Sequence, residues 1–194
     1  TAIPGEITPF YFNGELHRLG NFTRYDGGRM IRGCEIRRES DDAVLSTPFT
    51  GHYFSIAFMW ENKCWCFGRN DENGMKIDLT VSEDLIHWSE LETVWDISET
   101  GIRIFNCSVA FDGKRFVMAY ENNNPAFPIF TLNFLESTDL RHWQTIPGAV
   151  YGENKYIGGP SLYYMPDGFY YVTYVDQFVH PQARKLNYRT SIAR

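Results

Sequence analysis

The heptapeptide SEDLIHW, residues 82–88, returns as STDLRHW at residues 137–143, so Ser-x-Asp-Leu-x-His-Trp occurs twice, 55 residues apart. A second pair of landmarks has the same spacing, because Asp-Gly occurs at 112–113 and again at 167–168. Asp-Gly between two apolar runs is a strong hairpin signal, since glycine adopts a positive φ without steric cost. The repeat therefore divides the chain into similar antiparallel units of about 50 residues.

Each unit contains an apolar run, a tight turn and a second apolar run. These hairpins cover residues 8–22, 52–70, 106–121 and 159–176. A third apolar segment, at 75–82 and at 129–137, leads into each heptapeptide. Because no segment has a sustained 3.6-residue apolar period, we expect few helices. Three or four antiparallel strands per unit are typical of a β-propeller blade.

The sequence thus predicts an all-β fold, a five-bladed type of β-propeller with about four blades present. We expect one propeller domain over residues 1–194, with blades at about 5–50, 51–104, 105–156 and 157–194. The last unit ends where its heptapeptide would begin, so we expect a C-terminally incomplete domain. A further C-terminal segment, self-association or a four-bladed closure would complete the ring, and we favour the segment because open blade faces aggregate.

Composition restricts the kind of partner. Aromatic residues make up 16% of the chain, which favours strands, and the formal net charge of −6 argues against nucleic acid. No apolar run approaches 18 residues, so we expect no membrane span. Cys64 and Cys66 flank Trp65 on an expected strand, and we interpret them as core thiols rather than metal ligands. We expect no metal and no cofactor; secreted, periplasmic and cytoplasmic locations all stay open.

The heptapeptides are interpreted as turns rather than catalytic sequences. Ser and Asp near a strand end can accept hydrogen bonds from nearby backbone N–H groups and so close a tight turn. The Leu and Trp side chains then supply apolar bulk for packing within or between blades. His87 and His142 are expected at the surface or in packing contacts.

Taken together, the Asp-Gly hairpins, both Ser-x-Asp-Leu-x-x-Trp turns and the segment GGPSLYYMPDGFYYVTY (158–174) resemble a known family. They are similar, over essentially the whole chain, to the five-bladed propellers of glycoside hydrolase family 43 and its relatives. The resemblance implies sugar subsites at one end of the central channel. It also implies cleavage of arabinosyl or xylosyl linkages in plant polysaccharides by inversion.

The same resemblance implies three acids near the start of the first strand of blades one, three and four. The matching positions in this chain are Thr8, Asn106 and Gly158. None of them carries a carboxylate, although inverting hydrolysis needs one carboxyl to protonate the leaving oxygen and another to activate water. The resemblance therefore supports the fold more than the mechanism.

Two other carboxylates are expected at the ligand end. Glu121 and Asp176 lie 55 residues apart, at the expected ends of the second strands of successive blades. They could act as acid and base, or hold sugar hydroxyl groups, or simply be solvated strand ends. His180 is the candidate for a catalytic acid or base other than a carboxylate.

Loops between the second and third strands are expected over the same end, at 21–33, 121–128 and 176–185. Polar and aromatic side chains there suit sugars, although many surface loops have this composition. The predicted function is hydrolysis of a glycosidic bond in plant or microbial polysaccharide or oligosaccharide, by paired carboxylates. The alternatives are a non-catalytic carbohydrate-binding propeller and a propeller with no sugar ligand. The predicted substrate-binding residues are Arg24, Tyr25, Asp26, Asn106, Asn122, Tyr156 and Arg184.

Overall fold

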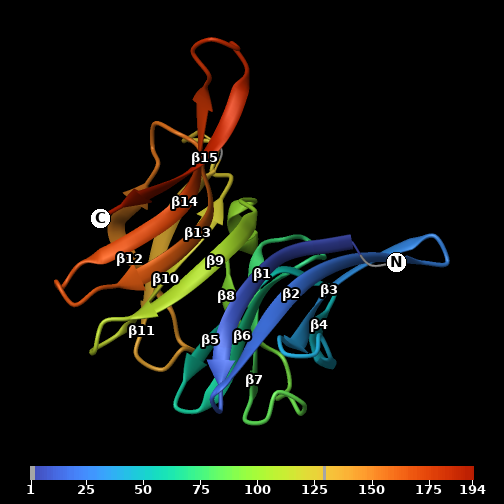
Figure 1. The fold of residues 1–194 in the computed structure, drawn as a ribbon. Helices are drawn as coiled ribbons and strands as arrows, with labels where there is room; N and C mark the ends of the chain where they lie inside the picture. Colours follow the sequence, from blue (N-terminus) through green and yellow to red (C-terminus); the bar gives the residue numbers. More distant parts are fainter. Residues whose placement is uncertain (1–2, 129) are drawn as a thin grey trace. The chain divides into compact units, whose positions relative to one another are not determined.

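The structure is a computed structural model that describes residues 3–128 and 130–194, and its strands form four antiparallel sheets (Figure 1). In each sheet, every strand lies beside its neighbour in sequence. The first two sheets contain β1 (Ile3–Phe12), β2 (Glu15–Asp26), β3 (Arg29–Arg38), β4 (Val44–Thr50), β5 (His52–Trp60), β6 (Lys63–Asn70), β7 (Lys76–Ser82) and β8 (Glu92–Asp96). The other two contain β9 (Ile104–Phe111), β10 (Phe116–Asn122), β11 (Thr131–Ser137), β12 (Gln144–Tyr151), β13 (Ile157–Tyr164), β14 (Tyr170–Val179) and β15 (Leu186–Ala193).

These sheets are blades of the β-propeller type, and the prediction of an all-β propeller fold is confirmed. The expected third strands are present as β7 and β11, with residue 129 outside the described residues. In the part of the chain that the structure describes, the one helical element is the 3₁₀ turn η1 (Ser98–Thr100), and no helix could span a bilayer.

The chain forms two compact units, which meet in sequence between Ser98 and Glu99. The first unit contains blades one and two, and the second contains blades three and four. Within each unit the first strands of the two blades are in contact, β1 with β5 and β9 with β13. Blade four has three strands, whereas the other blades have four.

Every first strand has an irregularity near its start. Between Pro4 and Ile7, between Tyr53 and Ile56, and between Gly158 and Ser161, the first strand carries one residue more than its partner strand, and β9 shows the same shift opposite the end of β10. Such β-bulges re-aim side chains and are common beside active sites. We call the end of a blade where its first strand begins and its second strand ends the rim.

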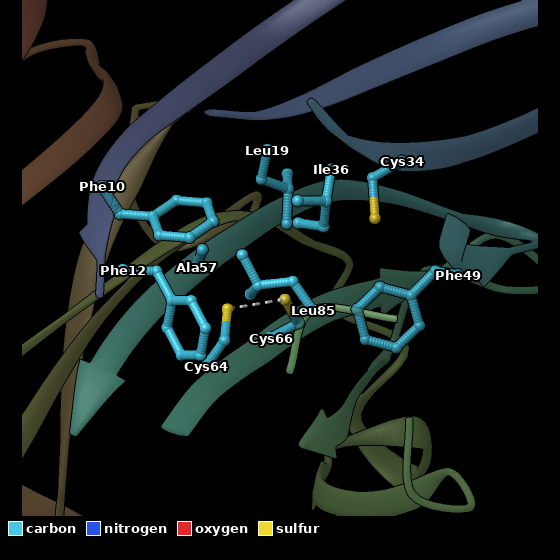
Figure 2. Close-up of a cluster of buried hydrophobic side chains, with 10 residues drawn as sticks. All are labelled: Phe10, Phe12, Leu19, Cys34, Ile36, Phe49, Ala57, Cys64, Cys66 and Leu85. Atoms are coloured by element: carbon cyan, nitrogen blue, oxygen red, sulfur yellow. Dashed lines mark hydrogen bonds between the residues drawn. The ribbon is translucent and has the colours of Figure 1, made fainter. Parts of the chain in front are cut away.

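Each unit buries its own apolar core between its two blades. In the first unit the core contains Phe10, Leu19, Ile36 and Phe49 from blade one, with Cys64 and Cys66 from blade two (Figure 2). Both of these cysteines are fully buried, with their Sγ atoms 3.8 Å apart, and burial raises the pKa of the nearby Cys34 thiol to about 12. The interpretation of Cys64 and Cys66 as core thiols is confirmed.

The first heptapeptide forms the predicted turn. Ser82 Oγ accepts a hydrogen bond from the Leu85 N–H (2.8 Å), and Asp84 Oδ1 accepts from the N–H groups of Ile86 and His87 (2.8 Å each). Leu85 has a φ of 65° and is 1% exposed, so burial of its side chain offsets an unfavourable backbone conformation. Trp88 Nε1 donates to Ser46 Oγ (2.9 Å) on β4, which ties this turn to blade one.

The second heptapeptide repeats the Ser and Asp hydrogen bonds of the first, whereas its Trp143 Nε1 donates to Leu140 O (3.0 Å) within the turn. Ser137 Oγ accepts from the Leu140 N–H (3.0 Å), and Asp139 Oδ1 accepts from the N–H groups of Arg141 and His142 (2.9 and 2.8 Å). Leu140 has a φ of 66° and is 1% exposed. The exposed His87 and His142 rings contact Asp84 and Asp139 at 2.7 Å, so the motif is a structural turn, as predicted.

Acid is expected to weaken both turns. The pKa of the Asp84 carboxyl lies well below its ordinary value, because the His87 imidazole and the backbone N–H groups of His87 and Ile86 bind the carboxylate. Burial by itself would raise the pKa of Asp139, but the backbone N–H and imidazole of His142 lower it well below its ordinary value.

A carboxylate whose pKa is lower in the folded chain stabilises the fold above its unfolded pKa of about 4, and this contribution is lost as the pH falls below that value. We expect the melting temperature to fall between about pH 5 and pH 2, and to fall less steeply in the double variant Asp84→Asn/Asp139→Asn. Circular dichroism melts across this range measure the slopes. Asp26→Asn, on an exposed hairpin, should keep the wild-type slope, and a double variant with that same slope would contradict the prediction.

Candidate functional site

Glu121 is the central residue of the rim of the second unit. It lies on β10, is 3% exposed, and its Oε2 accepts hydrogen bonds from Asn106 Nδ2 (3.0 Å) and from the Gly159 N–H (2.8 Å). Asn106 lies at the irregular start of β9, and Gly159 lies in the bulge of β13. The carboxylate therefore links the start of β9 to the start of β13. The family resemblance implies one acid at Asn106 itself and another at Gly158, the residue before Gly159.

In the first unit, Asn21 makes the same kind of link between two first strands. Counted from the hairpin that precedes it, Asn21 on β2 occupies the same place as Glu121 on β10. Asn21 Nδ2 donates to Glu6 O (3.0 Å) and to Ser55 O (2.9 Å), and its Oδ1 accepts from the Ser55 N–H (2.8 Å). A neutral amide thus connects the two bulges of the first unit. A side chain that joins two bulges therefore needs no charge. Glu121 nevertheless places a carboxyl group at the equivalent position of the second unit.

Asp176 is the second buried carboxylate of this rim. It lies on β14 and is 6% exposed. Its Oδ2 accepts hydrogen bonds from Arg189 Nε (3.2 Å) and Nη2 (3.0 Å) on β15. Asp176 is therefore held within its own blade, through the neighbouring strand β15.

The prediction that Glu121 and Asp176 occupy matching positions is wrong. Counted from the closing residue of its hairpin, Asp176 lies seven residues after Phe169, as Asn122 lies seven residues after Arg115, so Asn122 is the counterpart of Asp176. The cause is the turn between β13 and β14, which is one residue longer than the turn between β9 and β10. Two residues that lie 55 apart along the chain are therefore offset by one position when β10 and β14 are compared strand by strand.

This shift decides where Asp176 points. Alternate residues of a strand share a face, and a shift of one residue reverses it. Both carboxylates continue faces that belong to the apolar core of the second unit, because that core contains Val117 and Ala119 from β10 and Val172 and Tyr174 from β14. Glu121 and Asp176 therefore both stand at the rim of the core between blades three and four.

A tyrosine covers the position where the resemblance implies the third acid. A Cβ added at Gly158 would lie 2.8 Å from the Tyr156 hydroxyl oxygen and about 3 Å from its ring, so a side chain fits only if Tyr156 moves. The Tyr156 ring belongs to a row of aromatic rings. Its neighbours are Phe130 (5.4 Å between centroids) and Tyr188 (6.0 Å), and Phe130 in turn contacts Phe105 (4.5 Å).

Asn122, a predicted substrate-binding residue, binds within its own blade. It is 2% exposed, and its Nδ2 donates to Thr131 O (3.0 Å) and to Asn133 Oδ1 (2.7 Å). Its Oδ1 accepts from the Asn124 N–H (3.0 Å), which holds the start of the loop after β10. That loop lies within the predicted range 121–128. Asn122 therefore shapes the rim from inside the blade.

Two of the three predicted loops are wrong, because they are hairpin arms. Strands β2 and β3 stay paired up to Asp26 and Arg29, and β14 and β15 stay paired up to Val179 and Leu186 (Figure 1). Pairing satisfies the backbone hydrogen bonds of each arm from within. Arg24, Tyr25 and Asp26 consequently lie on an exposed arm of the first unit, with Tyr25 63% exposed.

His180 and Arg184 form the turn at the tip of the second arm. The His180 N–H donates to Lys185 O and the Arg184 N–H donates to His180 O, both at 2.9 Å, while His180 Nδ1 accepts from the Ala183 N–H (3.1 Å). With a rise of about 3.3 Å per residue, the strand carries His180 about 13 Å beyond Asp176. The structure therefore brings Glu121, Asp176, Asn106 and Tyr156 to one rim and separates His180 and Arg184 from them.

Sequence reasoning missed four contributors to this rim. Arg189 could be paired with Asp176 only once the β14–β15 register was known, and the Gly159 N–H is a backbone group without a sequence signal. Phe105 and Phe130 are far apart in sequence and meet only through the fold. Within residues 3–128 and 130–194, no three His, Cys, Asp or Glu side chains gather as metal ligands do.

The sequence matches no protein-family model, and no curated protein matches it. Solved structures do resemble it. An α-L-arabinofuranosidase of Fusarium graminearum is 14% identical, with a TM-score of 0.66 over 97% of this chain and 62% of that one. A xylan β-1,4-xylosidase of Bacillus halodurans is 11% identical, with a TM-score of 0.68 over 98% of this chain and 41% of that one. An α-L-arabinanase of Penicillium chrysogenum, complexed with arabinobiose, is 12% identical, with a TM-score of 0.63 over 97% and 62%.

These neighbours share the propeller fold with this chain, and at such identities the likeness is one of fold. The chain spans about three fifths of the length of the Fusarium enzyme.

Proposed function

We propose that this chain is part of a glycoside hydrolase-like protein that acts on plant or microbial polysaccharide or oligosaccharide. The observation that carries the proposal is the buried Glu121 carboxylate between the starts of β9 and β13. In the first unit the neutral amide of Asn21 is enough to join the two bulges. A carboxyl group at the equivalent position is therefore consistent with a catalytic role. The fold that the chain shares with glycosidases supports the same conclusion.

The two carboxyl groups lie in unlike surroundings, which is how a site separates an acid from a base. Glu121 accepts hydrogen bonds at the starts of two first strands, from Asn106 and Gly159, whereas Asp176 accepts from Arg189 of its own blade. We therefore assign Glu121 as the general acid and Asp176 as the general base.

In this scheme the Glu121 proton passes to the glycosidic oxygen as the bond from that oxygen to the anomeric carbon breaks. Water attacks the anomeric carbon, and Asp176 takes a proton from the water. The row of rings that includes Tyr156 and Phe130 supplies flat faces for the CH groups of a sugar ring. Asn106 holds Glu121 in position through its amide.

Hydrolysis of a panel of aryl glycosides and oligosaccharides by the purified protein tests the proposal. Asp176→Asn is expected to lower kcat/KM by about 10²-fold, and equally for good and poor leaving groups, because the base acts on water rather than on the leaving oxygen. Asp167→Asn, at the hairpin end of blade four, is the matched control and should keep the wild-type rate. Full turnover by Asp176→Asn would refute its role as base.

A carbohydrate-binding propeller without turnover is the second candidate. The correspondence between Glu121 and Asn21 favours it, because Glu121 then serves only to join two bulges. The ring of Tyr156 over Gly158 also favours it, since this ring occupies the place of an acid that the resemblance implies. Binding to a glycan array without any product would support this candidate, and hydrolysis by the pure protein would exclude it.

A further inference from the structure

A groove of about 680 Å³ lies at the rim of the first unit, and it exists because β3 is longer than β4. The pairing of these two strands stops at Gly33 and Thr50. Gly51 then turns the chain away, with a φ of 76°, and its N–H donates to Arg32 O (2.8 Å). Beyond this point the edge of β3 has no partner strand among the described residues. The groove follows that edge and is lined by Arg24, Arg29, Arg32, Gly51, Asp71 and Glu72, among others.

Two guanidinium groups share one carboxylate oxygen at the floor of the groove. Arg32 Nη1 and Arg69 Nη2 each donate to Asp71 Oδ1 at 2.8 Å. The Arg32 guanidinium also lies over the Tyr53 ring, 5.0 Å from its centroid. Asp71 therefore holds Arg32 in a fixed place, with 30% of the Arg32 side chain exposed.

Two further arginines come from the arm of β2 and β3. The Arg24 guanidinium lies over the Phe22 ring, 5.1 Å from its centroid, and Arg29 is exposed. Neither pairs with a carboxylate among residues 3–128 and 130–194. The groove thus presents three guanidinium groups and two carboxylates, those of Asp71 and Glu72, in a chain whose formal net charge is −6. Because the groove follows an edge, it receives side chains from both faces of the arm.

We propose that this groove binds an anionic group on a sugar chain, either the carboxylate of a hexuronate or a sulfate ester. The planar fork of arginine matches both groups with paired hydrogen bonds, and Arg24 and Arg29, which pair with no carboxylate in the part of the chain that the structure describes, favour a ligand with negative charge. The inference rests on the proposed function, since it names the substrate class as an acidic polysaccharide. In this assignment Arg24, Arg29 and Arg32 are binding residues, away from the bond that is cleaved.

Calorimetric titration of the protein compares an oligogalacturonate with its methyl ester, which keeps the sugar and removes the charge, and with a sulfated oligosaccharide. We expect the acid to bind at least about tenfold more tightly than its ester. The double variant Arg24→Gln/Arg29→Gln is expected to lose this preference. The double variant Arg37→Gln/Arg38→Gln removes the same charge from the opposite end of β3 and should keep it.

If the protein prefers the oligogalacturonate to its ester, and only the Arg24/Arg29 variant loses this preference, the proposal is supported and the group bound is a carboxylate. If the sulfated oligosaccharide binds and only the Arg24/Arg29 variant loses this binding, the proposal is supported and the group bound is a sulfate ester. Equal affinity for acid and ester, equal loss in both double variants, or no binding overturns it. Because binding is measured without turnover, these results are separate from the effect of Asp176→Asn on hydrolysis, which tests the proposed function.

Discussion

Glutamine in place of Glu121 is expected to lower kcat/KM for glycoside hydrolysis by about 10³-fold and to leave the melting temperature unchanged. The amide oxygen of glutamine can accept the hydrogen bonds that Asn106 Nδ2 and the Gly159 N–H donate to the carboxylate. Asn21 shows that an amide joins the bulges of two neighbouring blades. The proton that a general acid supplies is the one function that glutamine lacks.

The leaving group distinguishes loss of an acid from loss of structure. A dinitrophenyl glycoside needs little protonation to depart, so Glu121→Gln should cleave it at close to the wild-type rate and should fail on alkyl and oligosaccharide substrates. Glu121→Ala, which also removes the link between β9 and β13, should in addition lower the melting temperature. Wild-type rates for Glu121→Gln on every substrate would mean that the residue only joins the bulges, as Asn21 does.

Alanine in place of Phe49 is expected to lower the free energy of unfolding of the first unit by about 3–5 kcal/mol. Phe49 is 1% exposed, and its ring stacks on the His52 ring at 4.6 Å between centroids (Figure 2 shows its place in the core). A Cβ added at Gly68 would lie 3.0 Å from this ring, so the glycine leaves the space that the phenylalanine fills. Removal of the ring leaves a cavity in the apolar core of the first unit.

Urea unfolding followed by tryptophan fluorescence measures this effect, because four of the five tryptophans lie in the first unit. Tyr11→Ala is the control, since Tyr11 is 68% exposed and its removal should cost less than about 0.5 kcal/mol. Hydrogen exchange should show the loss of protection in β1–β8 and leave β9–β15 unchanged if the two units unfold separately. An unfolding midpoint within error of wild type for Phe49→Ala would contradict the prediction.

Hairpins and turns could be predicted well because their hydrogen bonds are local. Each Ser-x-Asp-Leu turn closes bonds within a few residues, so its sequence predicts its geometry. The sequence predicts a loop for the arm of β2 and β3 because residues 24–29 at its tip are exposed on both faces, which removes the alternation that marks a half-buried strand. Its turn at Gly27-Gly28 was a signal of the hairpin.

By itself, the sequence determined that the protein is built of β-propeller blades, where their hairpins turn, and which places lack the acids that the resemblance implies. Only the tertiary structure decided that Asp176 corresponds to Asn122 and that Glu121 joins the starts of β9 and β13. It also decided that Asp176 and Glu121, from neighbouring blades, face the same apolar core. The physical reason is the period of two in a strand. One extra residue in a turn reverses the face of every side chain that follows, and neither the closing pair of a hairpin nor a contact across blades can be deduced from spacing along the chain.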